Sequence, residues 1–185
     1  GYGAYLIDQF MSEKWNCRTD EFGGSFENRM RFPLELIKAV QKSCGADYPI
    51  VFKMSPVHLV EGGRTMEEGI RIAQVLERAG VAAIQVDVGA FDDTCYELIA
   101  PVYHQERVKQ FDVAAKIKET VSIPVFTQGK VGDPAEARAV FEEGKTDFVV
   151  LGRSFLADPQ WPNKVREDRI EDIVPCICCT YPCLG

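Results

Sequence analysis

The sequence predicts an α/β fold with a parallel β-sheet, and three observations support this prediction. From residue 26 onward, segments with apolar residues at helical spacing alternate with short apolar runs of strand length. These short runs are apolar almost throughout, which is typical of strands in a parallel sheet. Several helical segments start at a capping residue or end at a glycine. Strict alternation of helix and strand is the pattern of α/β proteins.

The first predicted helix lies in the stretch ENRMRFPLELIKAVQKSCG and ends at Gly45, because glycine readily terminates a helix. The short apolar run YPIVFKMS follows and is introduced by Pro49. We expect a strand there, near residues 49–54.

The second predicted helix lies in TMEEGIRIAQVLERAG. Thr65 and Glu68 match a capping box, in which each side chain binds the backbone N–H of the other residue. Gly80 is the expected end of this helix. The apolar run VAAIQVDVG then predicts a second strand, near residues 82–88.

Two further helix–strand pairs complete the alternation. A helix in RVKQFDVAAKIKETV, residues 107–121, precedes a strand near 123–128. In DPAEARAVFEEG, Asp133 is the predicted N-cap, Pro134 takes the first helical position and Gly144 ends the helix. TDFVVLG gives a strand near residues 147–151, and SFLADPQWPNKVRED begins a final helical region.

Four βα units leave two architectures open. Both a doubly wound open sheet and a (β/α)8 barrel alternate strands and helices, but a barrel usually takes about 250 residues. The chain has 185 residues and no low-complexity linker, so we expect a single domain. The residues alone therefore predict either an open sheet or half of a barrel.

The charge and hydropathy of the chain disfavour two classes of partner. The net charge of −7 argues against nucleic acid, whose binding requires a basic face. No apolar run approaches the ~20 residues that span a bilayer. The N-terminal stretch GYGAYLIDQF lacks the basic start and apolar run of a signal peptide. We therefore expect a cytoplasmic protein that binds neither nucleic acid nor membranes.

Glycine and a cation follow each of the last two predicted strands, at the carboxyl ends where both architectures bind ligands. Gly129 and Lys130 follow the third strand, and Gly152 and Arg153 follow the fourth. Glycine lets a backbone N–H approach an anion closely, and the cation neutralises the anion. Two such turns at equivalent positions predict an anion site.

Several other chemistries lack the residues that they need. His58 and His104 are too few and too far apart in the sequence to predict a metal site. No G-x-S-x-G elbow, G-x-G-x-x-G fingerprint or P-loop occurs. Acid–base chemistry would therefore depend on tyrosine, aspartate or glutamate.

Four cysteines gather near the end of the chain. Cys176, Cys179 and Cys183 have the spacing C-x2-C-x3-C, and Cys178 lies between them. Neighbouring thiolates suit zinc or an iron–sulfur cluster, and three thiols do not decide between the two. We expect Cys178 to point away from such a site and the fourth ligand to lie beyond residue 185. A tail with reactive thiols is the alternative.

The chain resembles the old yellow enzyme family, specifically its iron–sulfur branch, which includes the 2,4-dienoyl-CoA reductases and 2-enoate reductases. The most specific stretch is YLIDQFMSEKWNCRTDEFGGSFENRMRFPLE, residues 5–35. FKMSP, VSIPVFTQGKV, DFVVLGRSFLADP and CICCTYPC follow in the order of the family. The resemblance implies that the chain is the C-terminal half, strands five to eight, of a (β/α)8 TIM barrel. Residues 1–175 would belong to the barrel, and residues 176–185 would start the iron–sulfur segment.

The resemblance implies FMN and a [4Fe–4S] cluster as cofactors, with FAD and NAD(P)H serving the parent enzyme. Gly129, Lys130, Gly152 and Arg153 correspond to the FMN phosphate site, which agrees with the anion site predicted above. Lys53 corresponds to a position, usually arginine, near flavin N1 and O2. A cation there stabilises the negative charge of a reduced flavin.

Further roles follow from the same resemblance. Tyr5 corresponds to the tyrosine that protonates the substrate α-carbon while FMN delivers hydride to the β-carbon. Two residues earlier, where the family usually has histidine or asparagine to hold the substrate carbonyl, this chain has Gly3. Cys176, Cys179 and Cys183 correspond to three cluster ligands. The WNCRTDEFGGSFENR segment would have a mainly structural role in the loop after strand four.

The implied function is that of an NAD(P)H- and flavin-dependent ene-reductase, which reduces a C=C bond conjugated to a carbonyl or thioester. Its substrate would be a small enoate, enone or acyl-CoA. Two alternatives stay open, a flavin-free phosphate-binding barrel lyase or isomerase and an inactive metal-binding fragment. Because open sheet edges tend to pair, we expect the chain to self-associate or to pair with the missing half of the barrel.

Overall fold

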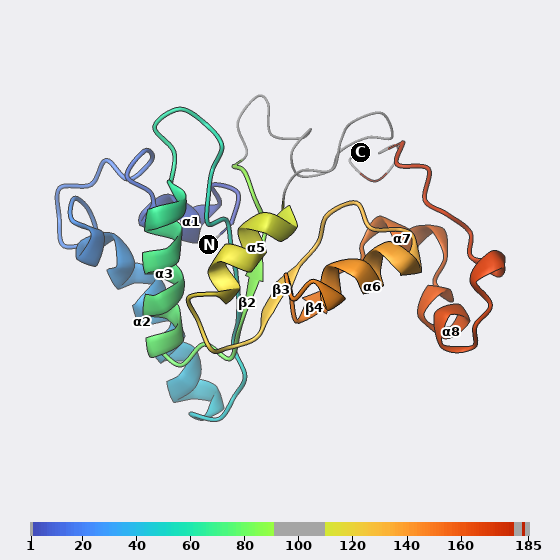
Figure 1. Ribbon diagram of the computed structural model, residues 1–185. Helices are drawn as coiled ribbons and strands as arrows, with labels where there is room; N and C mark the ends of the chain where they lie inside the picture. The colour runs from blue at the N-terminus through green and yellow to red at the C-terminus, as the bar shows by residue number, and fades with distance from the viewer. Residues whose placement is uncertain (1, 91–109, 180–182, 184–185) are drawn as a thin grey trace.

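The computed structural model describes residues 2–90, 110–179 and 183, and within them strands and helices alternate from β1 to α6 (Figure 1). The strands are β1 (Val51–Met54), β2 (Ala83–Val86), β3 (Val125–Thr127) and β4 (Phe148–Val149). The helices are α1 (Leu6–Met11), α2 (Phe26–Cys44), α3 (Met66–Arg78), α5 (Gln110–Lys118), α6 (Pro134–Glu142), α7 (Arg153–Ala157), α8 (Trp161–Arg166) and the 3-10 helix η1 (Ile170–Asp172). The predicted α/β class is confirmed. His104 and the start of the helix predicted at 107–121 lie outside the described residues.

The four strands form one parallel sheet in the order β1-β2-β3-β4. One row of paired residues crosses all four strands: Lys53 pairs with Gln85, Gln85 with Phe126, and Phe126 with Phe148. In a doubly wound sheet the strand order reverses at a switch point, whereas a barrel keeps its strands in sequence order. The observed order therefore fits part of a barrel and not the doubly wound alternative.

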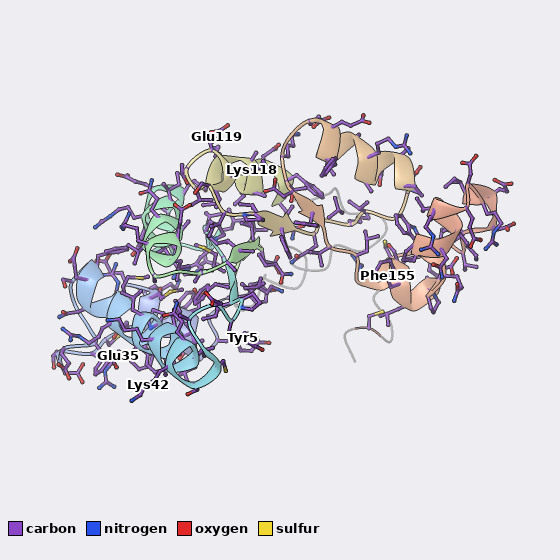
Figure 2. All side chains as sticks on the ribbon, turned by 90° about the horizontal axis from the view of Figure 1, so that it is seen from below. Tyr5, Glu35, Lys42, Lys118, Glu119 and Phe155 are labelled. Atoms are coloured by element: carbon purple, nitrogen blue, oxygen red, sulfur yellow. The ribbon has the colours of Figure 1, made fainter. Side chains whose placement is uncertain are left out.

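Helices cover one face of this sheet. Phe52 and Met54 of β1 and Ile84 and Val86 of β2 are buried against that helical layer. The helical side of this core consists of Met30, Ile37, Ile72, Ala73, Leu76, Ala114 and Ile117. In Figure 2 the helices follow one another around one side of the strands. Burial of each large aliphatic side chain stabilises the fold by about 1.5–3 kcal/mol.

The opposite face of the sheet has no helical layer among the described residues. Val51 is 51% exposed and Phe148 is 54% exposed, although both belong to strands. Phe148 packs against Phe126 with 4.6 Å between ring centroids. A half-barrel, one of the two predicted architectures, leaves the interior face of its sheet uncovered, and the exposure of Val51 and Phe148 agrees with it. The prediction that the chain self-associates or pairs with another half-barrel stays a prediction.

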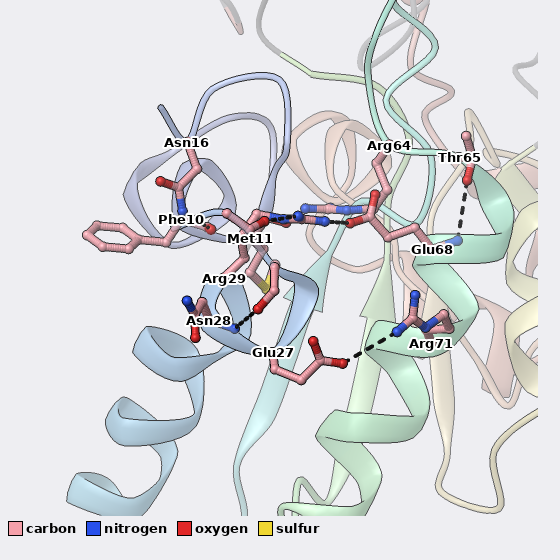
Figure 3. Close-up of polar contacts among 12 residues, drawn as sticks. Phe10, Met11, Asn16, Glu27, Asn28, Arg29, Arg64, Thr65, Glu68 and Arg71 are labelled. Atoms are coloured by element: carbon pink, nitrogen blue, oxygen red, sulfur yellow. Dashed lines mark hydrogen bonds and ion pairs between the residues drawn. The ribbon is translucent and has the colours of Figure 1, made fainter. Parts of the chain in front are cut away.

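The helix ends follow the predicted capping residues in most cases. The Thr65 hydroxyl accepts the N–H of Glu68 at 3.3 Å, and Gly80 takes the left-handed conformation after α3. The carboxylate of Glu68 instead forms an ion pair with Arg29 of α2, so it links two helices (Figure 3). Arg29 also donates to the carbonyl oxygens of Met11 and Gly24. These contacts agree with the structural role predicted for the segment that ends at Arg29.

Two features differ from the predicted elements. The short helix α1 was not predicted, because six residues carry too little periodicity to indicate a helix. The final helical region divides into α7 and α8 at Asp158. Asp158 precedes Pro159, which disfavours the helical conformation in the residue before it. Among the described residues, no helix is long and apolar enough to cross a membrane.

We predict that Gly69→Ala destabilises the protein, although alanine favours a helix over glycine by about 1 kcal/mol. A Cβ at Gly69 would lie 2.2 Å from the carbonyl oxygen of Pro56, so α3 or the loop after β1 must shift. We expect the free energy of unfolding in urea to fall by roughly 1–3 kcal/mol. The control Gln74→Ala, in the same helix, should change it by no more than about 0.5 kcal/mol. A Gly69→Ala variant as stable as the parent would contradict this prediction, because the loop after β1 would then move without cost.

Candidate functional site

A pocket of about 530 Å³ opens between the loops that follow β3 and β4. Its lining includes residues 128–133, residues 150–154, Cys176, Cys178 and Cys183. The predicted Gly–cation turns, Gly129–Lys130 and Gly152–Arg153, are therefore brought together at one pocket, as the anion-site prediction required. The carboxyl ends of parallel strands meet at one edge of the sheet, which explains this convergence.

The two glycines of this pocket differ in the space beside them. A Cβ at Gly129 would lie 2.7 Å from Oε1 of Gln110, so a side chain is excluded there by the protein itself. A Cβ at Gly152 would meet no atom within 4 Å, so the space beside its backbone is open. Gln110 Oε1 lines the pocket region and is buried without a hydrogen-bond partner among the described residues. The open space beside the Gly152 backbone and the two cations that line the pocket fit a phosphate-bearing ligand such as FMN.

The charges of Lys130 and Arg153 both affect the thiol of Cys178. Burial raises the pKa of the Cys178 thiol, and the positive charges of Arg153 and Lys130 lower it in part. Lys130 and Arg153 both line this pocket. Lys130 has the left-handed conformation, with φ 54°, which a lysine seldom adopts outside a tight turn. Asp133 and Glu136 also line the pocket, and the carboxylate of Asp133 caps α6 by accepting the N–H of Ala135.

The cysteine segment lies beside this pocket. The backbone N–H of Cys178 donates to Sγ of Cys176 at 3.4 Å, so these two residues lie together at the pocket. Cys179 and Cys183 are exposed. In the part of the chain that the structure describes, no three His, Cys, Asp or Glu side chains are arranged to hold a metal ion. The ligand set Cys176, Cys179 and Cys183 therefore stays a prediction.

A second polar cluster joins the ends of β1, β2 and β3. The buried carboxylate of Asp87 forms an ion pair with Nζ of Lys53 at 3.1 Å. It also accepts hydrogen bonds from the side-chain amides of Gln110 and Gln128 and from the N–H of Val88. Gln110 and Gln128 line the pocket as well. The pocket between the loops after β3 and β4 and the Lys53–Asp87 pair are thus two parts of one continuous site.

The pKa of the Asp87 carboxyl is raised above its ordinary value. Burial raises its pKa, and the charge and hydrogen bond of Lys53 offset only part of this effect. The Lys53 ammonium also lies 4.0 Å from the ring centroid of Tyr2, a cation–π distance. Lys53 is therefore fixed between a carboxylate and an aromatic face at the edge of the sheet.

Tyr5 lies at the same end of the molecule, at the N-cap of α1. Its side chain is 61% exposed and its ring centroid lies 6.3 Å from that of Tyr2, the residue that contacts Lys53. Gly3, two residues earlier, donates its backbone N–H to the hydroxyl of Ser55 at 3.4 Å. The structure thus brings Tyr5 and Lys53 to one region through Tyr2.

A buried ionic network supports this region. Asp8 binds Nη1 of Arg64 at 2.8 Å and Nε2 of His58 at 3.1 Å, and all three side chains are fully buried. Burial alone would raise the pKa of Asp8, but the hydrogen bond from His58 and the charge of Arg64 hold it well below its usual range. The edge of the His58 ring packs against Trp15. His58 therefore has a structural partner and is no metal ligand in this arrangement.

The sequence did not indicate the polar hub at Asp87 or the two glutamines that bind it. A signal was present, because Asp87 is an acidic residue directly after β2, at the carboxyl end where both predicted architectures bind ligands. Gln110 and Gln128 are 18 residues apart in the sequence. Nothing in their spacing indicates that both bind the same carboxylate.

Comparison with known proteins connects this site to one family. The sequence profile of the NADH:flavin oxidoreductase / NADH oxidase family matches residues 1–172. An NADH oxidase of Thermoanaerobacter brockii is 44% identical over 185 residues, which are 100% of this chain and 28% of that protein. A cinnamate reductase of Clostridium sporogenes is 35% identical over 98% of this chain and 29% of its own length. The chain thus spans less than a third of the length of these relatives.

Solved structures give the same result. A 2-naphthoyl-CoA reductase in complex with 2-naphthoyl-CoA superposes with a TM-score of 0.87 at 35% identity, over 96% of this chain and 27% of that one. An old yellow enzyme homologue of Zymomonas mobilis superposes with a TM-score of 0.68 over 90% of this chain and 44% of its own. The latter is 24% identical and supports the fold alone. The predicted partial barrel of the old yellow enzyme type is confirmed.

We predict that Asp87→Asn changes the pH dependence of stability. A carboxyl whose pKa is raised by folding contributes stability below its unfolded pKa, about 4, and loses it as the pH rises through the folded value. The asparagine variant lacks this loss. Its free energy of unfolding, relative to the parent, should therefore rise between pH ~4 and pH 7 in urea titrations.

Asp147→Asn is the matched control for this experiment. Burial of Asp147 is outweighed by Lys118 and the N–H of Val125, so its pKa is lowered. A lowered pKa gives stability above about pH 4 that is lost below it. The variant should therefore lose stability relative to the parent between pH ~3 and ~4, the opposite sign. Parallel curves for both variants would contradict the raised pKa of Asp87.

Proposed function

The chain belongs to the NADH:flavin oxidoreductase / NADH oxidase family, and we propose on this premise that it forms the FMN-binding part of an ene-reductase. The reaction would reduce a C=C bond conjugated to a carbonyl or thioester. The observation that carries the proposal is the pocket in which the turns of Lys130 and Arg153 converge beside the Lys53–Asp87 pair. The names of two relatives, a cinnamate reductase and a 2-naphthoyl-CoA reductase, support conjugated acids and thioesters as substrates.

In this proposal four residues hold the phosphate group of FMN. Gly129 and Gly152 let backbone N–H groups approach it, and Lys130 and Arg153 neutralise it. Lys53 binds the flavin ring at the edge near N1 and O2. Bound FMN supplies hydride to the substrate β-carbon.

Tyr5 is the proposed proton donor. Its exposed hydroxyl can meet a substrate from solvent, and the proton lost to the α-carbon is replaced from water. Because this chain has Gly3 where the family usually has a side chain for the carbonyl, another group would hold the substrate oxygen. We assign that role to no residue of this chain.

The division of the chain follows from the same proposal. Residues 1–175 form half of the FMN-binding barrel, and residues 176–185 start the iron–sulfur segment. Cys176, Cys179 and Cys183 are the proposed ligands of a [4Fe–4S] cluster, together with a fourth ligand outside this set, and such a cluster would supply electron transfer. The uncovered face with Val51 and Phe148 then faces the other half of the barrel.

The visible spectrum of the complete protein that carries this sequence, purified without oxygen, tests both cofactors. We expect flavin absorption together with a broad iron–sulfur shoulder. Arg153→Gln should weaken FMN binding by about tenfold or more, because one charge-assisted contact to phosphate is lost. It should leave the shoulder unchanged. Cys179→Ser should remove the shoulder and leave the flavin.

Arg138→Gln is the control for the arginine variant, because Arg138 lies on α6 and contributes to neither proposed site. A colourless protein that converts a sugar phosphate would favour the flavin-free lyase or isomerase instead. A colourless, inactive protein with bound zinc would favour a metal-binding fragment. Either result would contradict the proposed function.

We predict that Tyr5→Phe slows the reduction of trans-cinnamate by the complete protein by about 10²–10⁴-fold, because the general acid is lost. The FMN content should not change. Tyr48→Phe is the control, since Tyr48 is also exposed but lies in the loop before β1. Equal rates for the parent and Tyr5→Phe would remove Tyr5 from the mechanism.

A further inference from the structure

We propose that Asp8 is a positioning residue for Tyr5: its buried carboxylate, fixed by His58 and Arg64, holds the left-handed turn at Ala4 from which Tyr5 extends. This inference rests on the proposed role of Tyr5 and adds a supporting residue to it. The contacts that carry it come from α1, from the loop after β1 and from the end of β1.

The turn before Tyr5 is strained. Ala4 has φ 62°, a left-handed conformation that a residue with a Cβ disfavours, and Gly3 before it has φ 63°. Both polar groups of Ala4 are bound by α1. Its N–H donates to Oδ2 of Asp8 at 2.9 Å, and its carbonyl accepts from Nε2 of Gln9 at 2.7 Å. The strained conformation is therefore maintained by two side chains of the helix that Tyr5 caps.

Asp8 is itself fixed. Nδ1 of His58 accepts the backbone N–H of Arg64 at 2.9 Å, so Nε2 carries the proton and donates to Oδ2 of Asp8. Oδ1 of Asp8 accepts from Nη1 of Arg64. The three side chains are fully buried, so the carboxylate has no freedom to follow a movement of the turn. It is a rigid acceptor for Ala4.

The same arginine ties this acceptor to the sheet. Nη1 of Arg64 also donates to the carbonyl oxygen of Ser55 at 2.7 Å, directly after β1. The hydroxyl of Ser55 accepts the N–H of Gly3. The turn is thus connected to the end of β1 at two points, once through Ser55 and once through Asp8 and Arg64. Since Lys53 lies two residues before Ser55, this connection relates the position of Tyr5 to that of Lys53.

Loss of the Asp8 carboxylate should change the direction in which the Tyr5 side chain points. Without the acceptor at Ala4, that residue can return to negative φ, and this rotation redirects the Cα–Cβ bond of Tyr5. A misplaced acid loses rate, because proton transfer needs the donor within hydrogen-bond distance. Substrate binding that does not involve Tyr5 is unaffected. The turnover number should therefore fall while KM changes little.

The experiment uses the complete, FMN-loaded protein that carries this sequence, with trans-cinnamate as the substrate. Asp8→Asn should lower kcat about tenfold or more and change KM less than about threefold. In the Tyr5→Phe background it should have no further effect on kcat, because its action passes through the tyrosine hydroxyl. Ala4→Gly should restore part of the kcat lost in Asp8→Asn, because glycine adopts positive φ without strain.

Controls separate this role from general stabilisation. Asp20→Asn removes a carboxylate that binds Arg18 and the N–H of Phe22 in the following loop, and it should leave kcat unchanged. Where Asp8→Asn fails to fold, His58→Asn and His58→Gln replace it. Asparagine can keep an acceptor for the N–H of Arg64 and lose the donor to Asp8, whereas glutamine can keep that donor. The asparagine variant should be the slower of the two.

Each outcome decides the proposal. Asp8 would be only a structural residue if Asp8→Asn lowered kcat by the same factor with Tyr5 present and in the Tyr5→Phe background. The same would follow if Ala4→Gly restored none of the lost kcat. The proposed function would survive that result. An unchanged kcat in Tyr5→Phe alone would overturn the proposed acid and, with it, the positioning role.

Discussion

The parallel pairing of four strands in sequence order is the constraint on which the whole site depends. Parallel strands bring all their carboxyl ends to one edge, and sequence order makes each loop the neighbour of the next. Lys53, Asp87 and Gln128 therefore meet although more than thirty residues separate each from the next. The loops of Lys130 and Arg153 follow along the same edge. No local motif could gather these groups, and the sheet alone does so.

Two buried aspartates show how the surroundings decide the state of a carboxyl. Burial raises the pKa of both, but Asp8 is bound by a fully buried arginine, a histidine and a backbone N–H, and its pKa is lowered. The cation beside Asp87 is a lysine whose side chain is 38% exposed, and here burial prevails. A partly exposed ammonium compensates a buried carboxylate less than a fully buried guanidinium does. Asp8 therefore stays ionised, whereas Asp87 takes up a proton more readily.

The sequence predicted those features that depend on neighbouring residues. Asp133 before α6, Pro134 at its first position, Thr65 before α3 and Gly45 after α2 act as expected, because caps and stops are local chemistry. The uncovered face of the sheet, with Val51 and Phe148, followed from the half-barrel and not from periodicity, because strand composition does not reveal which face is covered. The Asp8–His58–Arg64 network could not be predicted from the sequence. His58 and Arg64 follow Asp8 by 50 and 56 residues in the sequence, and only the tertiary fold brings the three together.

The two ends of the candidate site differ in the groups that they present, and this difference constrains what can bind across it. At one end the Lys53 ammonium is matched by the Asp87 carboxylate, so the pair presents little net charge to a ligand. At the other end Lys130, Arg153 and the open backbone of Gly152 lie at a pocket of about 530 Å³, which Asp133 and Glu136 also line. Gln110 and Gln128 connect the ends with amide groups that can donate or accept. An elongated ligand with a phosphate group at one end and a hydrogen-bonding ring at the other can contact both ends of this site, whereas a compact sugar phosphate would reach only one.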